Sequence, residues 1–317
     1  MTATRDLTRF TPEDDLLHDE ISRSGPHARE SLLITAPIPE EQLLVFLYLW
    51  REGGDRWGRF VFVGGPEMDT PLFVSHADDA PFSGQDLRDF TVGGLHWRQP
   101  EPLRVAEVDF ASEAGTGGAP GLVLSLRFEG SHEPFSWHDN ADGCPDWVAH
   151  NRYEQSGLTR GVLTLGERRV EFTGAGHRDH SWGSRNWDML QHWKWMNAAT
   201  PDGSVSLHAM IMSVKGETLV NGYLNRDGLV SPIASAHASA TLDERMYHRA
   251  LSGRFTDEAG REMTLECEYA AGWSMPIQHL LLNEIGMTAT LDGRPAVAHV
   301  ELGWPADYVR ALTGPAA

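Results

Sequence analysis

Turn signals recur at short intervals through the second half of the chain, and they constrain its fold more than any other feature. Each signal combines glycine with an acidic residue, as tight hairpin turns do. These turns are Leu165-Gly166-Glu167, Pro201-Asp202-Gly203, Arg226-Asp227-Gly228, Asp257-Glu258-Ala259-Gly260 and Leu291-Asp292-Gly293. The intervening apolar segments have the length of strands: 162–165, 169–173, 204–214, 218–224, 263–269 and 287–291. The pattern therefore predicts an antiparallel meander.

The first half also favours strands. Short runs rich in apolar, β-branched or aromatic residues predict strands at 32–35, 43–50, 59–63 and 122–128. Helices are expected only at the ends, over 12–23 with Thr11 as the cap, and over 305–312. The glycine-rich segment 114–121 lacks the order of a phosphate-binding loop and is interpreted as a flexible loop.

These elements predict an all-β fold. A chain of 317 residues is long enough for two barrel-like or sandwich-like domains. We expect the boundary near residues 157–165, which gives an N-terminal domain over 1–160 and a C-terminal domain over 161–317.

Charge and cysteine content narrow the partners and the compartment. A formal net charge of -19 repels phosphate backbones and anionic membrane surfaces, so we expect no nucleic-acid partner. Cys144 and Cys267 lie far apart and form no disulfide framework, which favours the cytoplasm. The start of the chain lacks a signal peptide, and the longest apolar run, 43–50, is too short for stable membrane insertion.

One segment, 174–187, concentrates titratable and aromatic side chains: two His, one Asp, two Arg and two Trp. It follows a predicted strand that ends at Thr173, and in an extended chain residues of one parity share a face. His177 and Asp179 would then face one way. Arg178, His180 and Trp182 would face the other way. Proton-exchanging groups beside aromatic ones predict a pocket for acid–base chemistry on an apolar molecule.

Several residues are candidates for that chemistry. The proton donor or acceptor would be His180, Asp179 or Glu154, the last of these in the run 153–157. The alternative for His180 is a structural role as a hydrogen-bonded histidine. The alternative for Glu154 is an inter-domain salt bridge or hydrogen bond. Further residues would form the substrate pocket, with core packing or a local ion pair as the alternative for each. These are Trp182, Arg178, Arg185, Trp187, Trp195 and His208.

A metal site is the rival interpretation of the same residues. His177, Asp179, His180 and His192 are suitable ligand types. However, a His-x-x-His pair converges only on a helix, and the glycines of this segment oppose a helix. We therefore expect no metal. The chain also lacks a nucleotide-binding fingerprint and a serine nucleophile elbow, and we expect no cofactor.

The two segments 153–157 and 176–187 together resemble the AttH-like and carotenoid 1,2-hydratase (hydroxyneurosporene synthase) superfamily. They are most similar to an uncharacterised bacterial branch with the signature EQS…GxxDHSWGxRxW. The resemblance implies two lipocalin-like domains and a cavity for an apolar ligand. Relatives hydrate isolated double bonds without a cofactor, and related fungal proteins guide cyclisations. It also implies that His180 and Trp182 are active-site residues. A Tyr and an Asp of the hydratases find no match in 206–209.

We therefore expect a cofactor-independent enzyme of the lyase or isomerase type. It would hydrate, dehydrate, isomerise or cyclise a hydrophobic isoprenoid- or polyketide-like molecule. The alternative is a lipocalin-like carrier that binds such a ligand without chemistry. A titratable group within hydrogen-bond reach of the ligand would distinguish the enzyme from the carrier.

Overall fold

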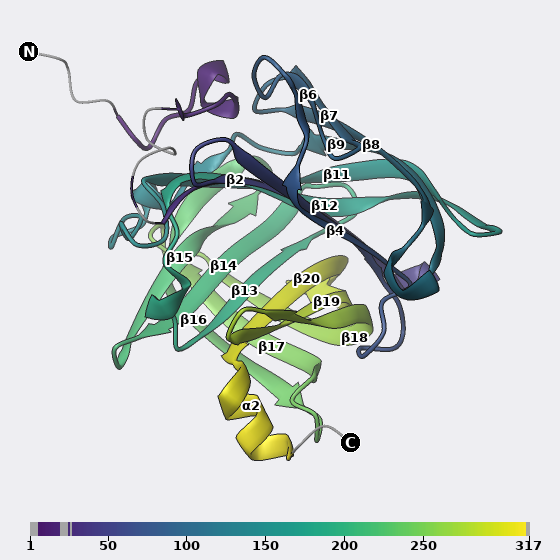
Figure 1. The fold of residues 1–317 in the computed structure, drawn as a ribbon. Helices are drawn as coiled ribbons and strands as arrows, with labels where there is room; N and C mark the ends of the chain where they lie inside the picture. Colours follow the sequence, from purple (N-terminus) through teal and green to yellow (C-terminus); the bar gives the residue numbers. More distant parts are fainter. Residues whose placement is uncertain (1–5, 20–24, 26, 315–317) are drawn as a thin grey trace, which may run out of the picture.

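The computed structural model describes residues 6–19, 25 and 27–314, and it confirms the all-β fold class (Figure 1). Two β-structures follow one another along the chain. The first is a large curved sheet, and the second is a closed barrel packed against one face of that sheet.

The first sheet has twelve antiparallel strands in the spatial order β4-β3-β2-β1-β12-β11-β9-β8-β7-β6-β5, with β10 paired to β11. Its strands are β1 (Ala28–Ile38), β2 (Leu43–Glu52), β3 (Arg56–Gly64), β4 (Phe73–Ala80), β5 (Phe82–Gly84), β6 (Asp89–Val92), β7 (Leu95–Glu101), β8 (Val105–Ala114), β9 (Pro120–Gly130), β10 (Phe135–Ser136), β11 (Asn151–Leu165) and β12 (Arg168–Ser184). The long hairpin of β11 and β12 therefore lies in the middle of this sheet.

The barrel is an eight-stranded meander in which the first and last strands pair and close the cylinder. Its strands are β13 (His192–Ala199), β14 (Val205–Val214), β15 (Glu217–Arg226), β16 (Leu229–Leu242), β17 (His248–Asp257), β18 (Glu262–Ile277), β19 (Leu280–Leu291) and β20 (Arg294–Pro305). Four of the five predicted turns connect its strands, and the fifth connects β11 to β12.

Helices are few and short. The predicted C-terminal helix is confirmed as α2 (Ala306–Thr313). The predicted N-terminal helix begins at Pro12 as expected, but it ends after one turn, because η1 (Pro12–Asp15) is a 3-10 turn and Leu16 after it is extended. The helix expected over 12–23 is therefore wrong for 16–18, and its part from 20 to 23 lies outside the described residues. The other 3-10 turns are η2 (Pro39–Glu41), η3 (Thr116–Gly118), η4 (Trp137–Asp139) and η5 (Trp187–Met189). Among the described helices, none has the length and apolarity to cross a membrane.

The chain changes from the sheet to the barrel between Ser184 and His192. The boundary expected near 157–165 lies inside β11, a strand of the first sheet. The signal that misplaced it was the turn at Gly166, which closes a hairpin within the sheet. The division of the chain into independent domains stays a prediction.

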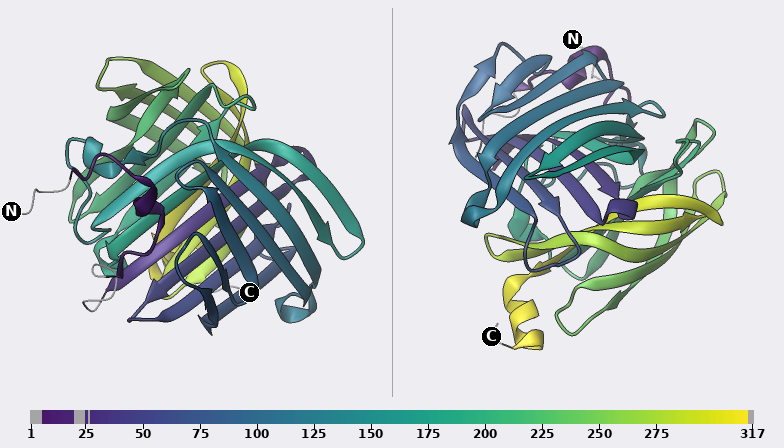
Figure 2. Two further views of the ribbon diagram at one scale, coloured as in Figure 1. Left: turned by 90° about the horizontal axis from the view of Figure 1, so that it is seen from above. Right: turned by 90° about the vertical axis from the view of Figure 1, so that its right-hand side faces the viewer.

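Three large apolar cores follow from the alternation of side chains along the strands, and a fourth, small cluster consists of Leu103, Tyr153 and Trp182. One fills the curved inside of the first sheet, one fills the barrel, and the third lies between the two. Figure 2 shows the barrel against the β1–β3 region of the sheet. A loop from the sheet joins them, because Gly65 pairs with Gly272 and the Ser274 amide donates to the Met68 carbonyl at 2.9 Å.

Candidate active site

A cavity of about 650 Å³ lies between the first sheet and the outer face of the barrel. Its walls are mainly apolar and aromatic, and several carboxyl and guanidinium groups reach it. Aromatic lining residues from the sheet include Phe46, Tyr48, Trp50 and Phe60, and those from the barrel include Trp193, Trp195 and Trp273. The volume and lining are those of a site for an apolar small molecule.

The aromatic wall was readable in the sequence but was not recognised there. In the run 43–50, aliphatic and aromatic side chains alternate after Leu44, and strand geometry sends them to opposite faces. The aliphatic residues Val45, Leu47 and Leu49 join the core of the sheet. Phe46 joins the core between sheet and barrel, so one strand supplies both a core and a cavity wall.

Asp179 on β12 is the candidate proton donor that reaches this cavity. Its side chain is 5% exposed, and its Oδ2 accepts a hydrogen bond from the Arg152 guanidinium at 2.6 Å. Burial raises the pKa of Asp179 to about 6, although the Arg152 charge opposes the shift. A carboxyl group with such a pKa can donate and recover a proton near neutrality.

Glu154 lies directly opposite Asp179 on the neighbouring strand β11 and does not line the cavity. It is fully buried and accepts hydrogen bonds from Arg152 Nε at 2.6 Å and from Trp195 Nε1 at 3.4 Å. Its other oxygen lies 2.8 Å from His177 Nε2. Burial raises the pKa of Glu154 and lowers the pKa of His177 to about 3, so the histidine is neutral. Glu154 therefore holds Arg152 in place and links the sheet to the barrel. This matches the alternative prediction for Glu154, an inter-domain salt bridge or hydrogen bond.

Three further predicted pocket residues line the cavity: Arg185, Trp187 and Trp195. Arg185 donates to Ser181 Oγ at 2.8 Å and to the Val148 carbonyl at 2.9 Å, and it lies over the Trp187 ring. It does not form the alternative local pair with Asp188. His208 is fully buried between the sheets, 3.4 Å from Glu154, and lies outside the cavity wall.

The opposite face of β12 carries Arg178, His180 and Trp182, and the predicted alternation is therefore confirmed. These residues do not line the cavity, contrary to the expectation that they would look into it. The N-terminal segment covers them: Trp182 stacks on His18 at 3.8 Å, and Phe10 packs edge-on against Trp182. Arg178 lies 3.6 Å from Asp15 Oδ2. Side chains along a strand alternate between its two faces, so the side chains of β12 that face the barrel are those of Asp179 and its neighbours two residues away. Arg178, His180 and Trp182 therefore face away from the cavity.

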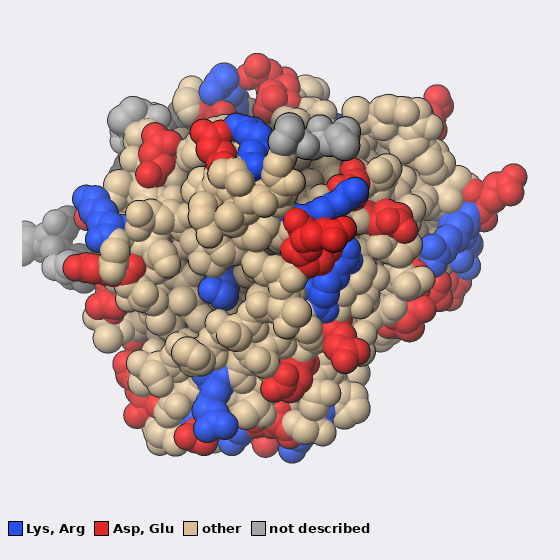
Figure 3. Space-filling model, turned by 90° about the horizontal axis from the view of Figure 1, so that it is seen from below, with Lys and Arg blue, Asp and Glu red and all other residues tan. Residues whose placement is uncertain are grey.

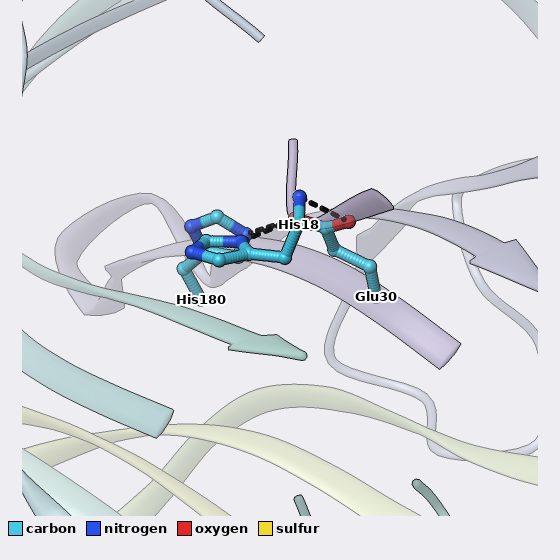
Figure 4. Close-up of side chains that lie close together, drawn as sticks. All are labelled: His18, Glu30 and His180. Atoms are coloured by element: carbon cyan, nitrogen blue, oxygen red, sulfur yellow. Dashed lines mark hydrogen bonds and ion pairs between the residues drawn. The ribbon is translucent and has the colours of Figure 1, made fainter. Parts of the chain in front are cut away.

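His180 belongs to a buried cluster with His18 and Glu30 (Figure 4). His18 Nδ1 and His180 Nε2 lie 2.9 and 3.1 Å from the same oxygen, Glu30 Oε1. Arg51 donates to the other oxygen of Glu30 at 3.0 Å. Burial opposes the ionised forms, but the hydrogen bonds and charges of the cluster raise the pKa of His18 and lower the pKa of Glu30. The cluster attaches the N-terminal segment to the sheet.

Two clusters of described residues have the spacing that metal ligands need. They are His18, Glu30 and His180 on one face, and Glu154, His177 and His208 on the other. In both clusters an arginine already binds the carboxylate, Arg51 in the first and Arg152 in the second. This charge competes with a cation. The four ligands of the rival sequence interpretation do not converge, because His177 and His180 point to opposite faces and His192 binds the Gly303 carbonyl. The absence of a metal stays a prediction.

Two acidic residues on the barrel side of the cavity wall escaped the sequence analysis. Glu284 on β19 and Glu301 on β20 both line the cavity from the barrel side. Each stands within an apolar strand, and that isolation was the signal that could have found them. Arg152 was missed for another reason, since only its register opposite Ser181 places it beside Asp179.

The fold and the site together define an all-β protein with an apolar cavity between a curved sheet and a barrel, and with titratable groups on the cavity walls. More particularly, the chain belongs to the family described as "Domain of unknown function (DUF7064)", which matches residues 11–306. No curated protein matches the sequence.

Two solved structures share the fold. The protein NE1406 of Nitrosomonas europaea, provisionally assigned to AttH, has a TM-score of 0.64 and 14% identity, with 95% of this chain and 97% of that chain covered. Kievitone hydratase from Nectria haematococca has a TM-score of 0.56 and 10% identity, with 94% and 95% covered. At these identities the comparisons establish the fold, which agrees with the superfamily resemblance in the sequence.

Proposed function

We propose that this protein is a hydro-lyase-type enzyme that adds water to, or removes it from, an apolar isoprenoid- or polyketide-like molecule in the cavity between sheet and barrel. The observation that carries the proposal is the position of Asp179, a buried carboxyl group on the wall of an apolar cavity. A carrier of apolar ligands has no need of such a group there. Isomerisation and cyclisation use the same first step, which is protonation of a double bond.

Each wall of the cavity has a role in this proposal. Asp179 donates a proton to the double bond, and Arg152 stabilises the carboxylate that remains. Trp187 and Trp195 present ring faces or edges to a developing positive charge on carbon, which is worth about 0.5–2 kcal/mol. Arg185 binds a polar end group of the substrate. All of these groups belong to the protein, so the reaction as proposed needs no cofactor.

The proposed substrate class follows from the lining and from the surface charge. The cavity favours an uncharged apolar molecule, and the hydratase among the fold relatives is named for acting on kievitone. Acidic and basic side chains are interspersed on the face in Figure 3, without a broad basic patch. Together with the net charge of -19, this supports a small-molecule substrate rather than a nucleic acid.

The two cysteines bear on the compartment of the protein. Cys144 and Cys267 are free and buried, which supports a reducing cytoplasm as its location.

The test is turnover of a small panel of isolated alkenes. Kievitone, geraniol and farnesol are each incubated with the purified protein, and mass spectrometry measures the gain or loss of one water. We expect hydration of at least one compound, and its loss in Asp179→Asn. If the wild type binds these compounds but never changes their mass or double-bond positions, the protein is a carrier and the proposal is wrong.

A further inference from the structure

We propose that Glu284 and Glu301 act together as a second proton-transfer group on the barrel wall of the cavity, taking up the proton that water loses when it adds to the substrate. This inference rests on the function proposed above. It places a second catalytic group in the barrel, whereas the motif at 174–187 lies outside the barrel strands.

The strand register places the two carboxyl groups side by side. Glu284 of β19 and Glu301 of β20 are directly opposite each other in an antiparallel pair, and both line the cavity. Side chains of such pairs leave the sheet on the same face, with Cβ atoms about 4.5–5.5 Å apart. Asp179 reaches the same cavity from β12 of the other sheet. A substrate between the two walls would therefore have one acidic group on each side.

The contacts of the pair differ from those of a structural ion pair. Glu284 Oε2 lies 2.8 Å from His299 Nε2, and Glu301 Oε1 accepts from the Trp193 indole N–H. Glu284 Oε1 is buried and accepts from no N–H or O–H of a residue outside the pair, and the two carboxyl groups hydrogen-bond to each other when one of them holds a proton. Among the described residues, no Lys or Arg forms an ion pair with either carboxyl group. A proton shared between the two carboxyl groups therefore satisfies the pair on the cavity wall without a cation.

Without a neighbouring cation, the pair holds a proton. Two carboxylates in one apolar site cannot both ionise readily, because burial and mutual repulsion both oppose the second charge. Burial raises the pKa of Glu284 to about 7 and that of Glu301 well above its usual range. Burial also lowers the pKa of His299 to about 4, so this histidine is neutral and positions Glu284 without adding charge. The pair can therefore gain or lose a proton near neutral pH.

The two walls then suit opposite proton transfers. Asp179 has Arg152 beside it to stabilise the anion, so it gives its proton to one carbon of the double bond. Water forms a bond to the cationic carbon, and its proton passes to the Glu284–Glu301 pair. The sum is addition of one water across the double bond. Proton exchange with solvent returns Asp179 and the pair to their starting states. Dehydration is the same sequence in reverse.

The experiment separates the two proton transfers. The wild type and the variants Asp179→Asn, Glu284→Gln and Glu301→Gln are incubated with geraniol, farnesol or kievitone in heavy water. We expect all three variants to lose about 10²–10⁴-fold in hydration. The glutamine variants should still incorporate deuterium into recovered alkene, since Asp179 protonates carbon and the cation reverts. Asp179→Asn should lose the exchange as well. Glu266→Gln on the exposed face of β18 is the matched control and should react normally.

The outcomes distinguish a failure of the Glu284–Glu301 pair from a failure of the proposed function. If the glutamine variants hydrate at the wild-type rate while Asp179→Asn does not, the pair has no catalytic role and the proposed function stands. If no compound reacts with the wild type, the proposed function fails. A second measurement needs no variant: infrared spectra of wild-type protein with carbon-labelled glutamate should show a protonated glutamic acid at neutral pH. Its absence would overturn the inference even if the variants do not fold.

Discussion

The two faces of β12 carry the same kinds of side chain and differ in what covers them. On one face, His180 and Trp182 lie under the N-terminal segment, and His180 shares Glu30 with His18. On the other face, Asp179 opens onto a cavity of about 650 Å³. A motif rich in titratable and aromatic residues is therefore not one site. The side chains on one face of β12 stabilise the sheet, and Asp179 on the other face reaches the cavity in which a ligand fits.

The largest effect expected from this difference is on turnover. Asp179→Asn should lower the turnover of an alkene substrate by about 10²–10⁴-fold, the usual contribution of a general acid. Affinity for the apolar substrate should change only a few-fold, because an amide occupies nearly the same space. Asp188→Asn makes the same chemical change at an exposed position and serves as the control. Equal turnover in both variants would remove Asp179 from the mechanism.

His180→Ala should act on stability instead. It removes one of the two imidazoles on Glu30 Oε1 and leaves a buried gap, at a cost on the order of 3 kcal/mol in the free energy of unfolding. The folded fraction should keep turnover within a few-fold. Denaturant unfolding measures the first expectation and steady-state kinetics the second. Because His18 shares the same oxygen, the combined loss with His18→Ala should not be additive. A large loss of turnover in folded His180→Ala would restore the role that the resemblance implied.

The barrel wall should make stability depend on pH. The pKa of Glu284 lies above its unfolded value, so the folded protein binds more protons, and stability falls as pH rises from about 4.5 to about 7. Glu284→Gln removes the part of this fall that Glu284 causes, while Glu301 keeps its own raised pKa, and the variant should gain about 1–3 kcal/mol on the wild type across that window. Neutral buried histidines such as His177 and His248 act in the opposite direction below pH 6.5. Their effect largely cancels in the difference between the two proteins. A constant difference between the two unfolding curves would show that Glu284 is ionised throughout.

The smallest effect concerns ligand affinity. Trp187 is half-buried on the cavity wall, and Trp187→Ala should weaken binding of the apolar fluorophore anilinonaphthalene sulfonate by roughly tenfold through lost contact area. Trp182→Ala should leave this affinity unchanged where the variant folds, since Trp182 contacts His18 and Phe10. Fluorescence titration compares them. Weaker binding in the Trp182 variant alone would place the ligand on the other face.

Local chemistry made much of the fold predictable. Glycine and acidic residues fixed the hairpins at Gly166, Gly203, Gly228, Gly260 and Gly293, and the alternation in β12 correctly separated Asp179 from His180. The change of sheet was not predictable, because Gly166 closes a turn inside the first sheet just as the other turns close hairpins of the barrel.

The site was only partly predictable for a related reason. Residues 177–187 supplied Asp179, Arg185 and Trp187, but sequence alone could not say which face of β12 meets the barrel. Arg152, Glu284 and Glu301 reach the same cavity only because a sheet and a barrel distant in sequence pack together. The isolation of Glu284 and Glu301 in apolar strands could have marked them as unusual, but nothing within a strand shows which cavity such a residue reaches.

The position of a bound ligand tests the central claim most directly. Crystals of the wild-type protein with a brominated farnesol analogue would locate the bromine by its anomalous scattering. We predict that the ligand lies between sheet and barrel, with its double bond beside Asp179 and its chain against Trp195 and Trp273. A ligand on the other face of β12, in contact with His180 and Trp182 and in place of the N-terminal segment, would contradict the account.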